Sequence, residues 1–412
     1  MPVDRVALRA MKPYMARDFY NPSALYAGAV RVREAVESAR KTAAGALFTQ
    51  PDTIIFTSGG TESINLAILG VVRRQQAVGS KRKWHIITSA VEHHAVLDTV
   101  KQLEREGCAV TYLPVDREGL IGIEDFKKAL RPETVLVSIM YANNEIGTIQ
   151  PLSEIGREIL KWRKRNGLRT SVFPYFHTDA CQAAAYLELN VEKLHVDLMS
   201  LNGSKIYGPK GSGILYKRRG VEIEPLMYGG GQELGARSGT ENVAGIVGFA
   251  KALELVQADR EKEWGRVERL RDYFWAELER KVTKTTLNGP AIFNEFRLRT
   301  QFVTPKKFKI KNSKSKINRL PNNLNITFTG ADAEAMIIYL DVAGIQCSSG
   351  SACTEATDEV SHVLLACGLD EDGARSSLRF TLGKSTTKKD IDYVLKALPG
   401  IVEKCRIMNS VN

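Results

Sequence analysis

The sequence predicts an α/β protein with a mostly parallel sheet, followed by a smaller α+β domain. Short runs rich in β-branched and aromatic residues alternate with amphipathic stretches of helical length, as in sheets that helices cover. The seven strand-like runs are residues 53–57, 84–88, 109–113, 135–140, 172–177, 196–200 and 212–216. The clearest helical stretches between them are residues 29–45, 62–73, 95–105 and 152–165. Ligands of such sheets bind beyond the carboxyl ends of the strands, so functional residues should follow the strands.

The pattern changes after a glycine-rich stretch at residues 229–245. The elements expected beyond it are long helices, one strand, a helix and a final amphipathic helix, at residues 243–281, 323–329, 331–343 and 388–407. This order predicts the smaller α+β domain. We expect a large domain over residues 13–250 and a small domain over residues 251–412 together with residues 1–12.

The composition is that of an enzyme-sized globular protein. The 412 residues are 43% hydrophobic and 25% charged, enough for two or three domains with buried cores. No run approaches the roughly 18 apolar residues of a membrane span, and the N-terminus lacks the apolar core of a signal peptide. We therefore expect a cytoplasmic protein. The six cysteines form no CxxC pair, which argues against a zinc ribbon or a disulfide framework.

The net charge of +11 is concentrated in one segment. Residues 295–319 hold nine Lys and Arg residues and one acid, a net +8 that leaves +3 for the rest of the chain. Three phenylalanines accompany these charges, but no RNA-binding motif does. We interpret the segment as a solvated loop, with an acidic partner or RNA as the alternative, and we do not expect direct nucleic-acid binding.

A glycine-rich turn after the first predicted strand suggests an anion site. Residues 56–63 read Phe-Thr-Ser-Gly-Gly-Thr-Glu-Ser and lead into a helix. Glycines let a ligand approach the backbone closely, and the amides at a helix N-terminus favour an anion such as phosphate. An ordinary helix start capped by Ser58 or Thr61 explains the same residues.

A lysine and an acid follow two other predicted strands. Lys205 lies within Gly-Ser-Lys-Ile-Tyr-Gly-Pro-Lys-Gly, where few bulky neighbours surround it. Such a lysine can form a Schiff base with a carbonyl cofactor, whereas a surface lysine in a turn is the alternative. Asp179 ends an apolar strand, and a carboxylate there can keep a pyridine nitrogen protonated or cap a helix.

Two adjacent histidines, His93 and His94, follow the strand expected at residues 84–88. No further His or Cys lies at metal-ligand spacing, so we expect no metal site. A ring stacked on a flat cofactor is the better interpretation of the pair.

A small, polar, glycine-containing stretch at residues 347–354 predicts a mobile loop that carries Cys353. A cysteine on such a loop can travel between a buried substrate and an outside acceptor. A buried structural cysteine is the alternative and suits Cys108 or Cys367 better. Arg379, flanked by apolar residues, suits bidentate binding of a substrate carboxylate.

Together these residues resemble the cysteine desulfurases of the class V aminotransferase superfamily. The similarity runs from about Val3 to Asn412. It rests on Thr57-Ser-Gly-Gly-Thr-Glu-Ser63, Glu92-His93, Asn143-Asn-Glu-Ile-Gly147, Asp179 with Gln182, Lys205-Ile-Tyr-Gly-Pro-Lys-Gly211, Arg237-Ser-Gly-Thr240, Ser348-Ser-Gly-Ser-Ala-Cys353 and Arg379. Ordered motifs along a whole chain are far more specific than any single one. The resemblance implies the fold type I architecture of pyridoxal-phosphate enzymes and a homodimer.

The resemblance also implies a role for each matching residue. Lys205 is then the Schiff-base lysine, Asp179 the partner of the pyridine nitrogen, and His93 the ring stacked on the cofactor. The other implied cofactor contacts are Gly60, Thr61, Asn202 and Ser204 around the phosphate, Asn144 and Gln182 at the phenolic oxygen, and Thr240 at the phosphate of the neighbouring subunit. The implied substrate-carboxylate binders are Asn21 and Arg379. Cys353 occupies the place of the persulfide-bearing cysteine, and Cys347 does not.

The implied activity is the removal of sulfur from L-cysteine, which yields L-alanine and a persulfide on Cys353. Lys205, His93 and Cys353 are the predicted catalytic residues. The resemblance implies an acceptor protein, either an iron-sulfur scaffold or a tRNA-thiolation relay, and Cys353 could ligate an iron-sulfur cluster during transfer. The alternatives are a selenocysteine lyase or desulfinase on the same scaffold, and a catalytically silent partner in sulfur transfer.

Three features depart from the family pattern. The chain starts at the equivalent of the proline that ends the N-terminal Asp-Asn-Ala-Ala-Thr-Thr-Pro segment of relatives. Asn202 and Ser204 stand where many relatives have Ser and His, which affects two expected phosphate contacts. Residues 295–319 look like an insertion where relatives have a short turn.

Overall fold

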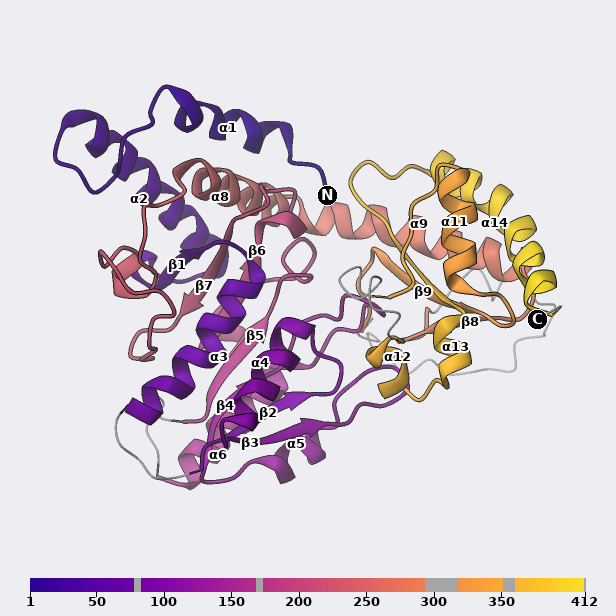
Figure 1. Ribbon diagram of the computed structural model, residues 1–412, viewed down its shortest axis with the longest axis horizontal. Coiled ribbons are helices and arrows are strands. Elements are labelled where there is room, and N and C mark those ends of the chain that lie inside the picture. Colours follow the sequence, from indigo (N-terminus) through magenta and orange to yellow (C-terminus); the bar gives the residue numbers. More distant parts are fainter. Residues whose placement is uncertain (78–82, 168–172, 293–317, 351–359, 411–412) are drawn as a thin grey trace, which may run out of the picture. The chain divides into compact units, whose positions relative to one another are not determined.

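The computed structural model describes residues 1–77, 83–167, 173–292, 318–350 and 360–410 (Figure 1). They form two compact units, and each unit has its own sheet. The first unit comprises Met1–Pro114, Ile121–Asn143 and Gln150–Glu261. The second unit comprises Val115–Leu120, Asn144–Ile149 and Lys262–Asn412.

The first unit is built on a seven-stranded sheet in the order β1-β7-β6-β5-β4-β2-β3. The strands are β1 (Ile54–Thr57), β2 (His85–Ser89), β3 (Ala109–Leu113), β4 (Thr134–Ser138), β5 (Tyr175–Asp179), β6 (Leu198–Asn202) and β7 (Gly213–Lys217). β7 pairs antiparallel with β1 and β6, and the other neighbours pair in parallel. The central strands are buried along their whole length, which explains their continuous apolar runs. The expected mostly parallel seven-stranded sheet is confirmed.

Helices alternate with these strands along the chain. They are α1 (Arg5–Ala16), α2 (Ala27–Leu47), α3 (Gly60–Ala77), α4 (His94–Arg105), α5 (Ile123–Ala129), α6 (Leu152–Arg165), α7 (Val191–Leu194) and α8 (Val243–Ala258). α3 packs against α4, and Ile68, Val100 and Leu136 belong to the core that both helices share with the sheet. The sequence did not predict α1, which packs on α8 within the first unit. Met11 of α1 lies where a Cβ atom on Gly248 would stand, so glycine permits this close approach.

Buried histidines join neighbouring strands inside the sheet. His177 on β5 contacts Ser138 Oγ through Nδ1 (2.8 Å) and Ser200 Oγ through Nε2 (2.9 Å), so it spans β4, β5 and β6. His85 on β2 contacts the hydroxyls of two threonines in the same way. Burial lowers the pKa of His177 to about 3 and that of His85 to about 4, so both rings are neutral at neutral pH.

The second unit has a three-stranded antiparallel sheet in the order β10-β9-β8. Its strands are β8 (Thr285–Asn288), β9 (Asn323–Phe328) and β10 (Ser377–Thr381). Its helices are α9 (Arg260–Lys281), which starts at the end of the first unit, α11 (Ala333–Val342), α12 (His362–Ala366), α13 (Glu371–Arg375) and α14 (Lys388–Asn409). Phe274 of α9, Ile326 of β9 and Leu398 of α14 belong to one buried core. The expected smaller α+β part is confirmed.

Arg319 is buried, although the sequence places it at the end of a solvated basic segment. Its guanidinium donates to the backbone carbonyls of Pro290 (2.7 Å), Asn323 (3.3 Å) and Asn288. The solvated interpretation is wrong for this residue, because buried carbonyls near the ends of β8 and β9 need donors inside the core. Residues 295–317 of the basic segment lie outside the described residues.

Acid should weaken the first unit through His177. The folded state lowers the pKa of His177 from 6.5 to about 3, so below pH 6.5 the unfolded chain binds the extra proton. Stability therefore falls as the pH drops from 6.5 towards 3, by up to about 1.4 kcal/mol per pH unit from this group. Urea unfolding of His177→Gln at several pH values should show a weaker acid dependence than wild type, while His94→Gln should match wild type. Equal acid dependence in all three proteins would contradict this account.

Candidate active site

The carboxyl ends of the parallel strands β1 to β6 lie at one edge of the first unit's sheet. β7 runs the opposite way and begins at this edge, where Gly213 pairs with Thr57 of β1 and Asn202 of β6. The turns after β1, β2, β5 and β6 carry most of the residues that the sequence selected. The strand order therefore gathers residues that are far apart in the chain.

Asp179, the last residue of β5, is a buried carboxylate at this edge, 7% exposed. Its Oδ1 accepts the amide hydrogen of Cys181 at 2.9 Å. Burial and the negative charge of Asp179 raise the pKa of the Cys181 thiol, and the positive charge of Lys205 opposes that shift. Lys205 ends the 3-10 turn η2 (Gly203–Lys205) directly after β6. The charges of Asp179 and Lys205 thus both act on the thiol of Cys181.

Gly60 closes the space between three of these turns. A Cβ atom at this position would stand 2.8 Å from Cys181 Sγ and 3.3 Å from Asn202 Cβ. Only a residue without a side chain lets the turn after β1 approach the turns after β5 and β6 this closely. Asn202 in turn accepts hydrogen bonds from the amide and the hydroxyl of Ser204, both at 3.1 Å, which fixes the turn that leads to Lys205.

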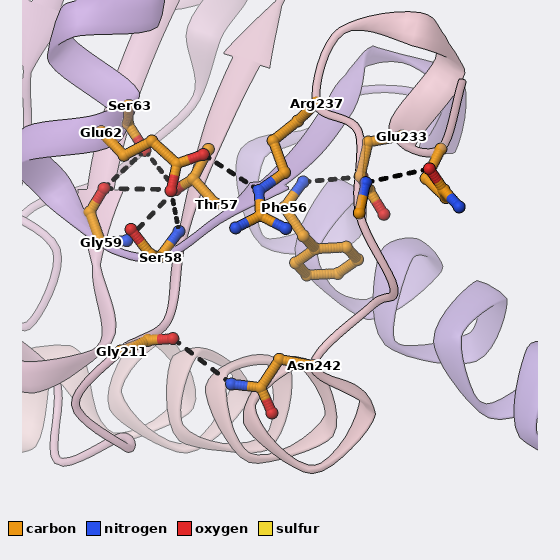
Figure 2. A network of polar contacts seen from close by, with 12 residues as sticks. Phe56, Thr57, Ser58, Gly59, Glu62, Ser63, Gly211, Glu233, Arg237 and Asn242 are labelled. Carbon is orange, nitrogen blue, oxygen red and sulfur yellow. Dashed lines mark hydrogen bonds and ion pairs between the residues drawn. The ribbon is translucent and has the colours of Figure 1, made fainter. Parts of the chain in front are cut away.

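The N-terminus of α3 has donors to offer a ligand. Within the described part of the chain, the amides of Gly60 and Thr61 donate to no protein acceptor. The amide of Ser58 donates to Glu62 Oε2 at 2.7 Å, and the hydroxyls of Thr57 and Ser63 lie 2.7 Å apart (Figure 2). The turn is therefore held by its own side chains while the first helical amides remain available to an anion.

The loop at residues 229–240 is anchored beside this turn. Arg237 donates to Glu62 Oε1 at 3.0 Å (Figure 2). Glu233 is buried and accepts from the amide of Phe56 on β1 at 2.8 Å and from both Nη atoms of Arg40 at 2.8 and 2.9 Å. Phe56 lies on the edge strand β1, so its amide has no neighbouring strand to donate to on that side. The Glu233 carboxylate accepts this hydrogen bond instead. These contacts fix the loop that carries Arg237 and Thr240.

Asn21 and Thr240 line one surface pocket of the first unit. Tyr20 and Asn242 are among the other residues of its wall. The family resemblance implies different ligand groups for the two residues, the substrate carboxylate for Asn21 and the phosphate of a neighbouring subunit for Thr240. The structure brings the two residues together, and the assignments stay predictions.

His93 begins α4 and caps it with its own side chain. Its Nδ1 accepts the amide hydrogen of Ala95 at 3.0 Å, so the proton of the neutral ring sits on Nε2. The preceding residue, Glu92, is fully buried, and its Oε1 accepts from Ser89 Oγ at 2.6 Å and from the amide of Met140 at 2.9 Å. Burial raises the pKa of Glu92 to about 8, and the charge of Asp179 contributes in the same direction. The turn that presents His93 is thus tied to the end of β4.

Asn144 and Arg379 belong to the second unit, where Arg379 Nη1 donates to the backbone carbonyl of Asn144 at 3.1 Å. Arg379 lies on β10 and pairs with Ser348, the first residue of the Ser348–Cys353 motif. Cys353 lies outside the described residues. Gln182 is half-buried in the turn after Asp179 in the first unit.

Comparison with known proteins shows the family of the chain. The model of the aminotransferase class-V family matches residues 2–306 and 297–394. A cysteine desulfurase IscS of Dictyoglomus turgidum is 44% identical over 408 residues, which cover 99% of this chain and 94% of the relative. The chain is a member of the cysteine desulfurase family of class-V aminotransferases.

Solved structures of this family share the fold. A NifS-like protein superposes with a TM-score of 0.83 at 34% identity, over 98% of this chain and 97% of its own. The structure of SspA in complex with cysteine gives a TM-score of 0.73 at 34% identity, over 93% of this chain and 96% of its own. The fold class expected from the sequence is thereby confirmed for this cysteine desulfurase family member.

The sequence missed several residues that shape the site of this desulfurase family member. The sequence analysis gave Glu92 no role beyond its place next to His93, and it gave Cys181 no role in the site. Glu233 carried a signal, because it is an acid within a glycine-rich loop beside a predicted edge strand, but its partner Arg40 is 193 residues away. No sequence pattern pairs residues over such a separation.

Neither a metal site nor a membrane span is found in the part of the chain that the structure describes. No group of three or more His, Cys, Asp or Glu side chains is arranged there to hold a metal ion. No helix there is both long enough and apolar enough to cross a bilayer. The cytoplasmic location stays a prediction.

Loss of the Glu233 carboxylate should destabilise the first unit. Glu233→Ala leaves the buried guanidinium of Arg40 and the amide of Phe56 without this acceptor, which should cost about 3 kcal/mol or more. Glu37→Ala removes the exposed partner of the same arginine and should cost less than about 1 kcal/mol. Urea unfolding of both variants measures the difference, and equal losses would show that Glu233 is not the anchor of the loop.

Proposed function

We propose that this chain is a pyridoxal-phosphate-dependent cysteine desulfurase that takes sulfur from L-cysteine, releases L-alanine and keeps the sulfur as a persulfide on Cys353. The observation that carries the proposal is the gathering of Asp179, Lys205 and the available amides of α3 at one edge of the sheet. The relative named cysteine desulfurase and the solved relative in complex with cysteine support the choice of substrate.

The residues at this edge fit pyridoxal phosphate. The amides of Gly60 and Thr61 suit the phosphate, because a helix N-terminus with spare donors attracts an anion. The buried carboxylate of Asp179 suits a protonated pyridine nitrogen, and the amine of Lys205 suits the aldehyde. The other residues that we expect to contact the cofactor are His93, Asn144, Gln182, Asn202, Ser204 and, from the neighbouring subunit, Thr240.

When bound, pyridoxal phosphate would supply an electron sink for the substrate Cα and so weaken the substrate's carbon-sulfur bond. Lys205 Nζ is the base that takes the Cα proton of cysteine and returns a proton later. The carboxylate of Asp179 would hold a proton on the pyridine nitrogen. His93 exchanges protons through Nε2, because Nδ1 accepts from the amide of Ala95.

The substrate is held by its carboxylate and loses its sulfur to a thiolate. The Arg379 guanidinium binds the carboxylate of cysteine, with Asn21 as a further polar contact. The Cys353 thiolate attacks the substrate sulfur, so a sulfur-sulfur bond forms while the Cβ-sulfur bond breaks. The Cβ atom gains a proton and the substrate leaves as alanine, so one cysteine yields one alanine and one persulfide.

A homodimer and a sulfur acceptor complete the proposal. Large apolar side chains in the first unit are strongly exposed, among them Phe19 (72%), Leu25 (91%), Tyr228 (80%) and Leu234 (65%). Phe19 lines the same pocket as Asn21 and Thr240, which supports a subunit contact at this place. The acceptor of the sulfur is an iron-sulfur scaffold or a tRNA-thiolation relay, with Cys353 able to ligate the cluster during transfer.

Cys353→Ala should abolish the activity that we propose. Purified wild-type protein with bound cofactor, L-cysteine and a thiol reductant should produce alanine and sulfide in equal amounts. Cys353→Ala should lower alanine formation by about 10³-fold or more, since no thiolate accepts the sulfur. Cys347→Ser, the matched control six residues earlier, should keep the wild-type rate. Turnover by Cys353→Ala at the wild-type rate would refute the nucleophile.

The same assay separates the remaining candidates. Turnover of selenocysteine but not cysteine would indicate a selenocysteine lyase on this scaffold. Failure to bind pyridoxal phosphate, or binding without turnover of either amino acid, would indicate a silent partner in sulfur transfer.

A further inference from the structure

Glu92 is a fully buried carboxyl group that joins the ends of two parallel strands of the first unit. Its Oε1 accepts from the hydroxyl of Ser89, the last residue of β2, at 2.6 Å. The same oxygen accepts from the amide of Met140, two residues beyond β4, at 2.9 Å. No step of the proposed reaction uses this group, although it immediately precedes His93.

Two further hydrogen bonds hold the turn that contains Glu92. The side chain of Asn143 is buried, and its Nδ2 donates to the backbone carbonyl of Val91 at 2.9 Å. The amide of Ala90 donates to the carbonyl of Leu113, at the end of β3, at 3.0 Å. The turn between β2 and α4 is therefore bound to the ends of both strands that neighbour β2.

His93 stands at the end of this turn, and its ring is oriented by its own hydrogen bond. Because Nδ1 accepts from the amide of Ala95 at 3.0 Å, Nε2 is the nitrogen that remains for proton exchange. The Cα atoms of consecutive residues are about 3.8 Å apart, so a shift of Glu92 is passed directly to His93. The position of Nε2 thus depends on the contacts that hold the turn.

The turn requires an acceptor at residue 92 and does not require a charge there. Burial raises the pKa of Glu92 to about 8, and the negative charge of Asp179 adds to this shift. At neutral pH most molecules therefore carry a proton on this carboxyl group. A glutamine reproduces the neutral form, because its carbonyl oxygen can accept both hydrogen bonds that Glu92 Oε1 accepts.

We propose that Glu92 is a positioning residue for His93, which fixes the turn between β2 and α4 and so sets where His93 Nε2 meets the reacting atoms. This inference rests on the proposed function. Removal of the Glu92 side chain takes from the amide of Met140 an acceptor inside the core, so the turn should shift. A misplacement of about 1 Å between reacting groups can cost about 100-fold in rate.

The first test asks whether Glu92 acts through His93. The rate of alanine formation from L-cysteine, per bound cofactor, is measured for Glu92→Ala in the wild-type and in the His93→Ala background. The substitution should slow the wild-type enzyme by about 10-fold to 100-fold. It should slow His93→Ala by less than about 3-fold, because the group that Glu92 positions is already absent. Glu92→Gln should stay within about 3-fold of wild type.

The second test needs neither cofactor nor turnover. NMR spectra of the cofactor-free protein with labelled histidines report the tautomer of each ring, and the signals of His93 are identified by their loss in His93→Ala. Wild type and Glu92→Gln should show the tautomer with the proton on Nε2. In Glu92→Ala the His93 signals should move towards those of a free histidine, which exchanges between both tautomers.

Two further variants keep the tests decisive. Ser89→Ala removes one donor to Glu92 and should slow alanine formation by about 3-fold or more in the wild-type background but not in His93→Ala. This variant decides the question if Glu92→Ala does not fold. Asn190→Ala removes the N-cap of α7 in the same unit and should leave both the rate and the His93 signals unchanged.

Equal losses from Glu92→Ala in the two backgrounds, a wild-type rate in Glu92→Ala, or unchanged His93 signals would overturn the positioning role. A change as large in Asn190→Ala would overturn it as well, because any loss of stability would then have the same effect. Failure of the wild-type enzyme to form alanine would instead overturn the proposed function, so the two failures are distinguishable.

Discussion

The site depends on a buried carboxylate at the end of a central strand. Asp179 is almost fully enclosed, and a buried charge is costly unless donors and a cation compensate it. The backbone amide of Cys181 donates to Asp179. The positive charge of Lys205 acts on the thiol of the same cysteine and opposes the effect of the Asp179 charge on its pKa. A ligand that brings a positively charged nitrogen to Asp179 would complete this compensation, which is the electrostatic reason why a protonated pyridine ring suits the site.

Asp179 is held in place by contacts among protein residues that are not themselves expected to bind a ligand. His177 precedes it by two residues and links β5 to the strands on either side through two hydroxyl groups. Gly60 lets the turn before α3 come within contact distance of the turn after Asp179. Further out, Glu233 attaches the loop of Arg237 to the outermost strand. The positions of the residues at this edge of the sheet are therefore fixed by buried hydrogen bonds and by the close approach that Gly60 permits.

Much of the architecture is visible in the sequence, because long buried strands and amphipathic helices leave periodic patterns. The elements that escaped prediction have physical reasons to do so. α1 contains Pro13 and buries only Ala7 and Met11, so its helical pattern is weak. α12 and α13 have five residues each, too few to show a helical period. β8 is four residues long and only partly buried, so it lacks the apolar run of a central strand.

Site residues that belong to a local motif could be predicted from the sequence. Contacts between residues far apart in the chain could not, because only the fold brings these residues together. Asp179 ends β5 and Lys205 comes shortly after β6, so their common location at one edge of the sheet could be expected from the pattern of strands. Ser361 donates a hydrogen bond to Glu145, but the two residues are 216 positions apart and no local sequence pattern predicts the contact. Roles such as those of Gln182 and Thr240 came from resemblance alone, because their residue types carry no specific chemistry by themselves.

The most direct test of the account is the rate of alanine formation by Asp179→Asn. Asparagine keeps the size of the side chain and an oxygen for the amide of Cys181, but it carries no charge. If the buried negative charge drives the chemistry, the variant should still bind pyridoxal phosphate while alanine formation falls by about 10³-fold or more. Alanine formation at the wild-type rate would contradict the central role given to this carboxylate.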